Sequence, residues 1–289
     1  MTRTFHRKDL PLTVLQAIVL GLTQGATEFA PISSSGHLIL VPWLFNWSIV
    51  NDVALNKTFD VALHVGTLVG AVAYFRQDIW RYLVAWIHSI RTRAIATTDE
   101  RLAWALVLGT IPGAAAGAVF EETIQKHLGQ PWLIAIMLAV FGVVLFVADR
   151  AAITRHEEDF KLRDAALMGL GQAVALQPGV SRSGITMTAA RWIGLDRESA
   201  ARFSFLLAIP IIAGAGLFKG VGLLHTGFQG YGSEFFWGFV SSAISGFIVI
   251  WGVLGYLRRH TFKAFMYYRL AVAALIFILI ATGARSATI

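Results

Sequence analysis

Residues 27–37, TEFAPISSSGH, place a carboxylate, three consecutive serines and an imidazole within eleven residues of an otherwise apolar stretch. Gln24 precedes Glu28 by one helical turn, so the amide and the carboxylate would share one helix face. Ser34 close to His37 would combine a nucleophile with a group that carries its proton. We therefore predict that this cluster takes part in chemistry.

A second polar cluster, QPGVSRSGIT at residues 177–186, supplies a cation. Arg182 lies between Ser181 and Ser183, and Thr186 follows one helical turn later. An arginine in a serine-rich turn suits a phosphate, because guanidinium, hydroxyl and backbone N–H donors converge where the helix dipole favours an anion. A glutamate near that anion needs protonation or a cation, and a bridging divalent metal is the usual solution. Together the two clusters predict phosphoryl transfer.

The composition identifies the surroundings of these clusters. Of the 289 residues, 56% are hydrophobic and 14% are charged, with a mean hydropathy of +0.64, whereas soluble domains carry about 25% charged residues. A transmembrane helix needs about 20 apolar residues. Short connections leave no room for a soluble domain, so we predict one all-α integral membrane domain over residues 1–289. Six transmembrane helices are expected near residues 59–75, 102–120, 131–149, 200–220, 235–257 and 267–283.

The formal charge of +7 does not indicate a nucleic-acid partner, because the basic residues are not gathered into a patch with interleaved aromatic side chains. The chain has no cysteine, which excludes disulfides and thiolate chemistry. Its first 30 residues resemble a signal peptide, with a basic start and an apolar continuation. Because this segment recurs later in the chain, we expect it to be retained.

The recurrence is an internal repeat. Residues 21–37 align without a gap with residues 169–185. Chance similarity between apolar segments is the alternative, but identical small and polar residues in register favour two related halves, at 10–149 and 164–283. The identical pairs are Gly21 with Gly169, Leu22 with Leu170, Gln24 with Gln172, Ser33 with Ser181, Ser35 with Ser183, and Gly36 with Gly184.

Each polar cluster lies between two apolar stretches that are too short to span a membrane. Serine and glycine interrupt the helix there, and non-helical backbone at membrane depth must be buried in protein or line a wet cavity. We therefore predict two re-entrant helix-turn-helix hairpins with polar tips, at residues 10–45 and 164–195. Two full crossings by each hairpin are the alternative.

The basic residues predict the orientation. With either type of hairpin, sixteen lysines and arginines share one face, in the segments 76–101, 150–163, 191–202 and 258–269, and seven lie on the other. The richer face should be cytoplasmic. Both termini then lie outside, and the second half is inverted relative to the first. Inverted repeats form their sites at the repeat interface, near the membrane midplane.

Each cluster also has a simpler interpretation. Serines and glycines in membrane helices often serve close packing, and His37 alone could be an interior hydrogen-bonding residue. Ionisable residues at membrane depth are costly, which makes Glu28 and Arg182 functional candidates, although they could form a structural salt bridge with each other. His64 lies in a predicted span, and we expect a buried hydrogen-bonding residue there rather than a ligand.

The two clusters resemble the motifs of the bacterial undecaprenyl-pyrophosphate phosphatases of the bacitracin-resistance type. The first block resembles their glutamate-rich motif and PGVSRSGIT their PGxSRSxxT motif, and the similarity extends through FSFLLAIP at 203–210 over nearly the whole chain. The resemblance implies an integral membrane enzyme that removes the terminal phosphate of the C55 polyprenyl pyrophosphate. The product would be the lipid carrier that is reused in peptidoglycan synthesis of the cell wall.

The resemblance also implies residue roles. Ser34 would be the nucleophile, His37 the acid or base, Glu28 an acidic motif residue and Arg182 the phosphate clamp. Direct attack by His37 is the alternative that the sequence leaves open. Hydroxyls that support phosphate binding would belong to Ser33, Ser35, Ser181, Ser183 and Thr186.

The family is described as needing a divalent cation, Mg²⁺ or Ca²⁺, for which Glu28 and Gln24 are the candidate ligands. Gln24 departs from many members of the family, which have glutamate at this position. The family's pattern admits either residue, so activity is still expected. Glu28 would then carry more of the metal-binding role.

The implied location is the bacterial inner membrane, with a multi-pass chain and a site open to the periplasmic side. Its partners would be the polyprenyl pyrophosphate substrate and membrane lipids, without nucleic acid, and a homodimer is compatible with the sequence. The main alternative function is a polyprenyl-phosphate transporter or flippase, because inverted repeats around a midplane anion site are also a transporter architecture. The nearness of Ser34 to His37 favours an enzyme.

Overall fold

The computed structural model of the chain describes residues 12–47, 53–226 and 230–289, with the side chains of 53–57, 121–126 and 218–226 left aside. These residues form eleven α-helices, a short 3₁₀ helix and no β-strand, which confirms the all-α prediction. The start of the predicted first hairpin, residues 10 and 11, lies outside this description. The helices are α1 Val14–Phe29, α2 Ser34–Phe45, α3 Val53–Tyr74, α4 Arg76–Thr92, α5 Thr98–His127, α6 Pro131–Ala148, α7 Leu162–Val174, α8 Arg182–Trp192, α9 Arg197–Thr226, α10 Gly232–Leu257 and α11 Lys263–Ala281.

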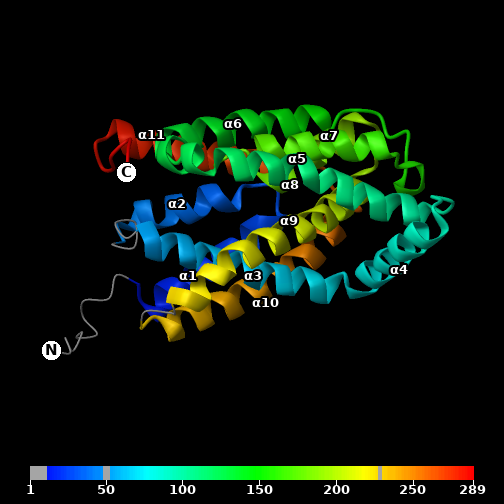
Figure 1. Ribbon diagram of the computed structural model, residues 1–289. Coiled ribbons are helices and arrows are strands. Elements are labelled where there is room, and N and C mark those ends of the chain that lie inside the picture. Colours follow the sequence, from blue (N-terminus) through cyan, green and yellow to red (C-terminus); the bar gives the residue numbers. More distant parts are fainter. Residues whose placement is uncertain (1–11, 48–52, 227–229) are drawn as a thin grey trace.

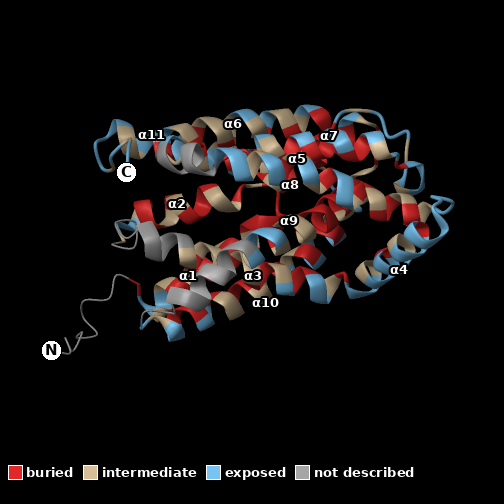
Figure 2. Ribbon diagram, viewed as in Figure 1, coloured by how far each residue is buried: buried red, intermediate tan, exposed pale blue. Residues whose placement is uncertain are grey.

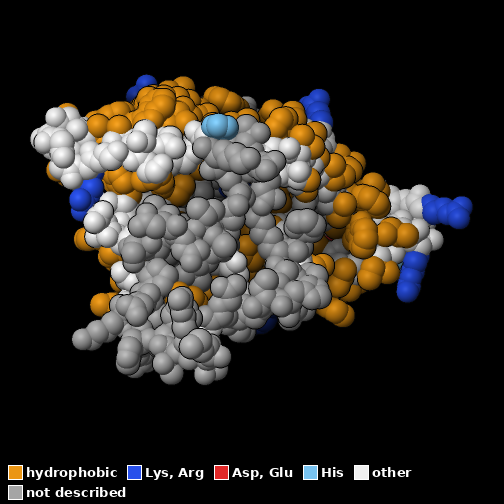
Figure 3. All heavy atoms as spheres, turned by 60° about the vertical axis from the view of Figure 1, so that its left-hand side comes forward, with side chains coloured by type: hydrophobic (Ala, Val, Ile, Leu, Met, Phe, Trp, Pro, Cys, Tyr) orange, Lys and Arg blue, Asp and Glu red, His pale blue; other side chains and the backbone are white. Residues whose placement is uncertain are grey.

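Five of these helices are long and apolar enough to cross a membrane, and they coincide with five of the six predicted spans: α5, α6, α9, α10 and α11. The sixth predicted span corresponds to α3, which qualifies only together with α4, across a bend of 82°. Hydrophobic side chains cover much of the described surface in Figure 3, and basic side chains lie around its edge. The chain is therefore a multi-pass membrane protein.

The segment 76–101, which the sequence predicted as a basic loop, contains helix α4. Its exposed hydrophobic residues recur at helical spacing, so they form one stripe along the helix, with Arg76 and Arg91 near the two ends of this face. A helix with such a stripe suits the boundary between hydrocarbon and water. The stripe consists of Trp80, Leu83, Val84, Ile87 and Ile90.

Two of the basic residues assigned to cytoplasmic loops are buried instead. Arg269 lies inside α11 and Arg191 near the end of α8, and both have 0% exposure. The terminal nitrogens of both guanidinium groups donate to backbone carbonyl oxygens, and Arg191 also pairs with Asp149, which is how these charges are tolerated away from water. The loop assignment was therefore wrong for these two residues. The other basic residues still give the predicted cytoplasmic face a large excess of lysine and arginine.

The helix pairs α1–α2 and α7–α8 are hairpins whose tips meet in the interior of the bundle (Figure 1). Before α7, Thr154 donates its backbone N–H to the carbonyl oxygen of Gly194, which follows α8, at 3.0 Å. Leu12, before α1, belongs to the same hydrophobic cluster as Trp47, which follows α2. In each hairpin, the segment before the first helix and the segment after the second thus lie near each other.

Small residues bring the first helix of each hairpin close to its neighbour. Helix α1 packs against α10, where a Cβ added at Gly21 or Gly25 would lie within about 2 Å of a serine hydroxyl of α10. Helix α7 packs against α5, where a Cβ at Gly169 would lie 2.6 Å from the carbonyl oxygen of Gly109. Such close packing is typical of membrane helices. Buried residues concentrate where α7, α8 and α9 meet (Figure 2), which gives the tips a rigid setting.

Candidate active site

The two hairpin tips turn in the same way. Ser33 caps α2 with φ 77° and Ser181 caps α8 with φ 76°, a backbone region that is unfavourable for residues with a side chain. Each serine Oγ accepts a hydrogen bond from the backbone N–H three residues later, at 3.4 Å from Gly36 and 3.1 Å from Gly184. Such strained turns persist where the surrounding structure holds them, often at functional sites.

The tips are hydrogen-bonded to each other. The backbone N–H of Gly179 donates to Ser33 Oγ at 3.0 Å, and Ser183 Oγ donates to the carbonyl oxygen of Ala30 at 3.1 Å. Gly179 has φ 96°, and a Cβ there would lie 2.7 Å from the carbonyl oxygen of Ile134, so this position requires glycine. Ser33 and Ser183, predicted to bind phosphate, therefore join the two halves of the chain in this structure.

Arg269 of α11 holds both tips from one side. Its Nη1 donates to the carbonyl oxygen of Pro31 at 3.1 Å, and its Nη2 to those of Gly179 at 2.7 Å and Val180 at 3.0 Å. The role of Arg269 was not predicted, because the residue was assigned to a loop. The signal was present, because Arg269 lies within the predicted span 267–283, where an ionisable residue is a functional candidate.

Glu28 is the centre of the site. Its side chain is 2% exposed. Oε2 accepts hydrogen bonds from Gln24 Nε2 at 2.9 Å and from Ser34 Oγ at 2.5 Å, and Oε1 accepts from Arg182 Nη2 at 3.0 Å. The spacing argument for Gln24 and Glu28 is confirmed. The structure thus brings three predicted residues, from both halves of the chain, onto the carboxylate of a fourth.

His64 of α3 also lies beside this carboxylate, with Nε2 3.6 Å from Glu28 Oε2. Its Nδ1 donates to the carbonyl oxygen of Asp60 at 2.7 Å, as expected for a hydrogen-bonding interior histidine. The side chain is 27% exposed, so His64 lines the accessible side of the site. The position of His64 beside Glu28 was not predicted, because no local sequence pattern shows that α3 packs next to the end of α1.

His37 does not contact Ser34 through a hydrogen bond in this structure. Its Nδ1 donates to the carbonyl oxygen of Ser33 at 2.7 Å, and its Nε2 is 2.9 Å from the hydroxyl of Tyr268. Ser34 donates to Glu28 instead. The expected hydroxyl–imidazole pair is therefore replaced by a hydroxyl–carboxylate pair, because helix α2 directs the two side chains to different partners. Tyr268, which the sequence analysis did not select, fixes the imidazole.

The remaining predicted hydroxyls form hydrogen bonds with neighbouring protein groups. Thr186 Oγ1 is 2.6 Å from Ser204 Oγ of α9 and donates to the carbonyl oxygen of Arg182 at 2.8 Å, so it joins α8 to α9. Ser181 Oγ is 3.2 Å from Ser183 Oγ. Ser35 Oγ, partly exposed, is 3.5 Å from Ser33 Oγ. Only Ser34 among the predicted hydroxyls bonds to Glu28.

The oxygen atoms around Glu28 fit a hard divalent cation. Gln24 Oε1 is buried and has no hydrogen-bond partner, which leaves an amide oxygen free for a ligand. Among the described residues, no group of three or more histidines, aspartates and glutamates is arranged to hold a metal. This donor set suits Mg²⁺ or Ca²⁺ bound by one carboxylate, one amide oxygen and phosphate oxygens of a substrate, rather than by a protein cage.

Residues 17–275, which include both tips, match the family described as bacitracin resistance protein BacA. The chain belongs to the BacA family. An undecaprenyl-diphosphatase of Hahella chejuensis is 47% identical over 263 residues, which cover 91% of this chain and 97% of that relative. Undecaprenyl-diphosphatases of Moorella thermoacetica and Pelotomaculum thermopropionicum are 47% and 46% identical, over 92% and 93% of this chain and 97% and 98% of their own lengths.

Membership of the BacA family confirms the resemblance drawn from the two motifs. All three relatives are named as diphosphatases, so the comparison supports a hydrolase and gives no support to the transport alternative. The BacA match includes Glu28, Ser34 and Arg182.

Proposed function

We propose that this chain is a membrane phosphatase that hydrolyses undecaprenyl diphosphate to undecaprenyl phosphate and inorganic phosphate. The reaction would recycle the lipid carrier of peptidoglycan synthesis. The observation that carries the proposal is the Glu28 carboxylate, with the Ser34 hydroxyl on Oε2 at 2.5 Å and the Arg182 guanidinium on Oε1 at 3.0 Å. A nucleophile, a proton acceptor and a phosphate-binding cation are thus in contact, and the family relationship supplies the substrate.

In the first step, Ser34 Oγ attacks the terminal phosphorus and its proton passes to Glu28. The bond from this phosphorus to the bridging oxygen breaks, and undecaprenyl phosphate leaves with the electron pair and takes the proton from Glu28, which is again a carboxylate. Arg182 turns from Glu28 to the phosphate oxygens, where its donors stabilise the charge of the transition state. In the second step, water attacks the phosphoserine and gives a proton to Glu28, and Glu28 returns this proton to the Ser34 oxygen as that oxygen leaves.

His37 supports the Ser34 turn in this mechanism, because its Nδ1 is committed to the carbonyl oxygen of Ser33. The alternative is attack by His37 itself through Nε2. That route requires the contact of Nε2 with the Tyr268 hydroxyl to open. Ser34 is favoured because its hydroxyl already has a proton acceptor.

Glu28 and Gln24 Oε1 are the proposed ligands of a divalent cation, Mg²⁺ or Ca²⁺. When bound, the cation would neutralise phosphate charge and so help the nucleophile to approach. The free amide oxygen of Gln24 supports this assignment. Because Gln24 is neutral, Glu28 is the only charged ligand in the proposed set.

The proposed location is the inner membrane, with the site open to the periplasmic side and both hairpins re-entrant within inverted repeats 10–149 and 164–283. The end of the first hairpin contacts the C-terminal segment, since Arg285 Nη2 donates to the carbonyl oxygen of Leu44 at 2.6 Å. The ends of the second hairpin lie together at Arg155 and Leu195, beyond the opposite end of α6. Two full crossings from opposite sides would separate the tips, whereas here the tips touch.

The test is phosphate release from a prenyl pyrophosphate by the purified full-length protein, with and without EDTA. We expect Glu28→Gln and Arg182→Gln to lose at least 10²-fold in activity. Thr23→Ala is the matched control, because Thr23 lies beside Gln24 on α1 but donates to the carbonyl oxygen of Val19 in its own helix, at 2.8 Å, rather than to Glu28. Unchanged release by Glu28→Gln would refute the mechanism, and lipid binding without any release by the folded wild type would refute the proposed activity.

A further inference from the structure

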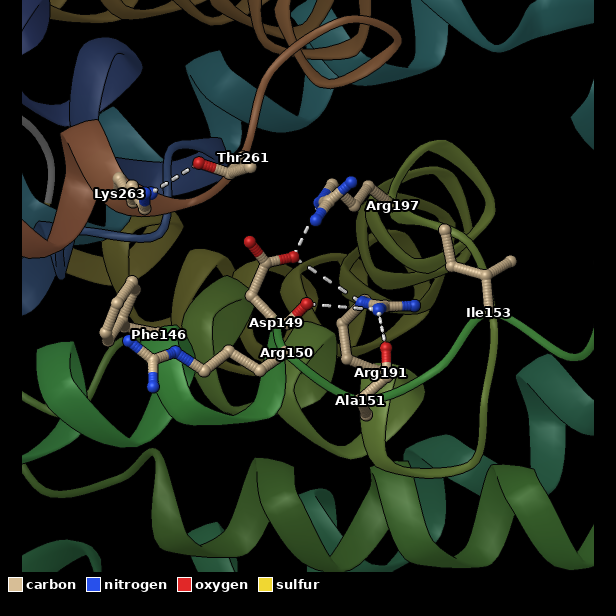
Figure 4. Close-up of a pocket in the computed structure, with 9 residues that line it drawn as sticks. All are labelled: Phe146, Asp149, Arg150, Ala151, Ile153, Arg191, Arg197, Thr261 and Lys263. Atoms are coloured by element: carbon tan, nitrogen blue, oxygen red, sulfur yellow. Dashed lines mark hydrogen bonds and ion pairs between the residues drawn. The ribbon is translucent and has the colours of Figure 1, made fainter.

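A cavity of about 530 Å³ lies away from the hairpin tips, where α6, α8, α9 and α11 have ends close together (Figure 4). Its lining contains four cationic side chains and a single carboxylate. The cations are Arg150, Arg191, Arg197 and Lys263, and the carboxylate is Asp149. None of these residues belongs to the proposed catalytic site.

The carboxylate is already committed to two arginines. Asp149 Oδ1 accepts a hydrogen bond from Arg197 Nε at 2.6 Å and lies 3.6 Å from Arg191 Nε. Arg191 is fully buried, and its Nη2 also donates to the carbonyl oxygens of Asp149 at 3.2 Å and Ala151 at 2.5 Å. At the base of the cavity, one negative charge thus faces two positive charges. The two exposed cations add further positive charge.

Arg150 and Lys263 add positive charge at the rim. Both side chains are exposed, and neither forms an ion pair with a carboxylate of the described residues. The guanidinium of Arg150 lies 4.5 Å from the ring centre of Phe146, which holds it at the rim. Arg197 uses only Nε toward Asp149 in the described contacts, so its two terminal nitrogens are free to donate. This arrangement suits an anion with several acceptor oxygens.

The position of the cavity favours a lipid as the source of that anion. Arg150 follows the end of the α6 span at Ala148, while Arg197 and Lys263 begin the α9 and α11 spans. Headgroup phosphates of a bilayer lie at this level. Val143 and Val147 of α6, one helical turn apart, are 43% and 53% exposed and lead from the cavity along the span. This apolar path suits an acyl chain attached to the bound headgroup.

We propose that this cavity binds the phosphate group of an anionic phospholipid, with Arg150, Arg197 and Lys263 as donors. Inorganic phosphate shares the same chemistry, but it would not use the apolar path along α6. The proposal does not depend on the function assigned to the hairpin tips. Since the surrounding segments are those predicted to face the cytoplasm, the lipid would belong to the inner leaflet.

The test is native mass spectrometry of the full-length protein titrated with phosphatidylglycerol, and separately with phosphatidylcholine. We expect preferential retention of phosphatidylglycerol by the wild type. Arg150→Gln/Lys263→Gln should weaken retention about 30-fold, or about fivefold for each charge, because a cation near an anionic membrane surface contributes about 1 kcal/mol. Arg91→Gln/Arg93→Gln is the matched control, since it removes two exposed charges at the end of α4 and should bind as the wild type does.

Equal weakening in both double variants would overturn the proposal, because it would show only a general charge effect. Competition by inorganic phosphate with no preference between the two lipids would also overturn it and would assign the cavity to a free anion. The melting temperature without added lipid checks folding of each variant. Lys263→Gln alone, at an exposed helix start, gives the same test with the fivefold effect if the double variant does not fold.

Discussion

At the scale of single residues, the Glu28 carboxylate explains why both halves of the chain are needed for one site. It receives donors from its own helix, from the following turn and from the second hairpin. Ionising a buried carboxylate is costly unless such donors surround it. The pair with Arg182 resembles the structural salt bridge that the sequence also allowed, but the short contact with Ser34 gives the same carboxylate a chemical partner.

The nucleophile can be identified by trapping the phosphoenzyme with radiolabelled substrate. We expect no label in Ser34→Ala, because the hydroxyl that donates to Glu28 would be absent. His37→Ala should still form labelled protein, although more slowly, since the imidazole only fixes the turn at Ser33. Label that persists in Ser34→Ala and disappears in His37→Ala would instead identify His37 as the nucleophile.

Gln24 tests the metal assignment. Gln24→Ala removes the free Oε1 and the bond to Glu28, so the Mg²⁺ concentration needed for half-maximal activity should rise about tenfold or more. Gln24→Glu adds a charged ligand and should lower that concentration. Titration of phosphate release with Mg²⁺ after EDTA treatment measures both effects. Unchanged Mg²⁺ dependence in both variants would contradict a ligand role for Gln24.

Contacts between site residues that are close in the sequence could be predicted, whereas contacts between residues far apart in the sequence could not. Gln24 and Glu28 lie on one helix, where spacing fixes the contact. His37 was the predicted partner of Ser34, whereas Ser34 donates to Glu28 in this structure, because two groups three residues apart at a helix start can point to different neighbours. Tyr268 is 231 residues from His37, so its contact follows only from packing. No local pattern indicates such a pair.

At the scale of elements, α11 connects the two hairpins through Arg269. Arg269→Leu removes the donor from the carbonyl oxygens of Pro31, Gly179 and Val180, and each loss costs about 1–3 kcal/mol. We expect the free energy of unfolding to fall by at least about 3 kcal/mol, with a smaller loss for Arg269→Lys. Unfolding in detergent checks this, with the exposed Arg259→Leu as control. Equal stability of Arg269→Leu and the control would contradict the role.

Helix α9 begins at a cap whose stability should depend on pH. Asp196 Oδ1 accepts the backbone N–H of Ser199 at 2.9 Å, and Oδ2 accepts its hydroxyl at 2.6 Å. Burial alone raises the pKa of Asp196, but the hydrogen bonds from Ser199 and His156 outweigh it and hold the pKa below its ordinary value. The stabilisation is therefore present above the unfolded-state pKa and is lost as the pH falls through the lower, folded-state pKa.

We expect Asp196→Ala to cost about 1 kcal/mol at neutral pH, and Asp196→Asn much less, because asparagine also caps helices well. The difference between wild type and Asp196→Asn should shrink as the pH falls below about 4. Thermal unfolding at a series of pH values measures it. A difference that is independent of pH would show that the carboxylate does not stabilise this helix start by its charge.

The elements were predicted best where apolar length decides the structure. Helices α5, α6, α9, α10 and α11 coincide with predicted spans because continuous hydrophobicity leaves a membrane-embedded chain little choice but helix. Helix α4 was missed because only its arginines were counted, and the helical spacing of its apolar residues was not considered. The charge count predicted a side of the membrane for each loop, but it carried no information on the secondary structure.

At the scale of the whole molecule, the predicted inverted arrangement would assign each end of the bundle to one side of the membrane, and the chain is suited to test this prediction because it contains no cysteine. Glu158→Cys and Arg259→Cys place single thiols at exposed positions of the end predicted to be cytoplasmic. Gly232→Cys and Thr288→Cys place them at exposed positions of the opposite end.

A membrane-impermeant thiol reagent added to intact spheroplasts should label Gly232→Cys and Thr288→Cys, whereas Glu158→Cys and Arg259→Cys should react only after permeabilisation. The physical reason is that α10 and α11 each cross once between these ends, and the basic excess holds one end inside. Labelling of Glu158→Cys and Thr288→Cys from the same side would contradict the inverted topology.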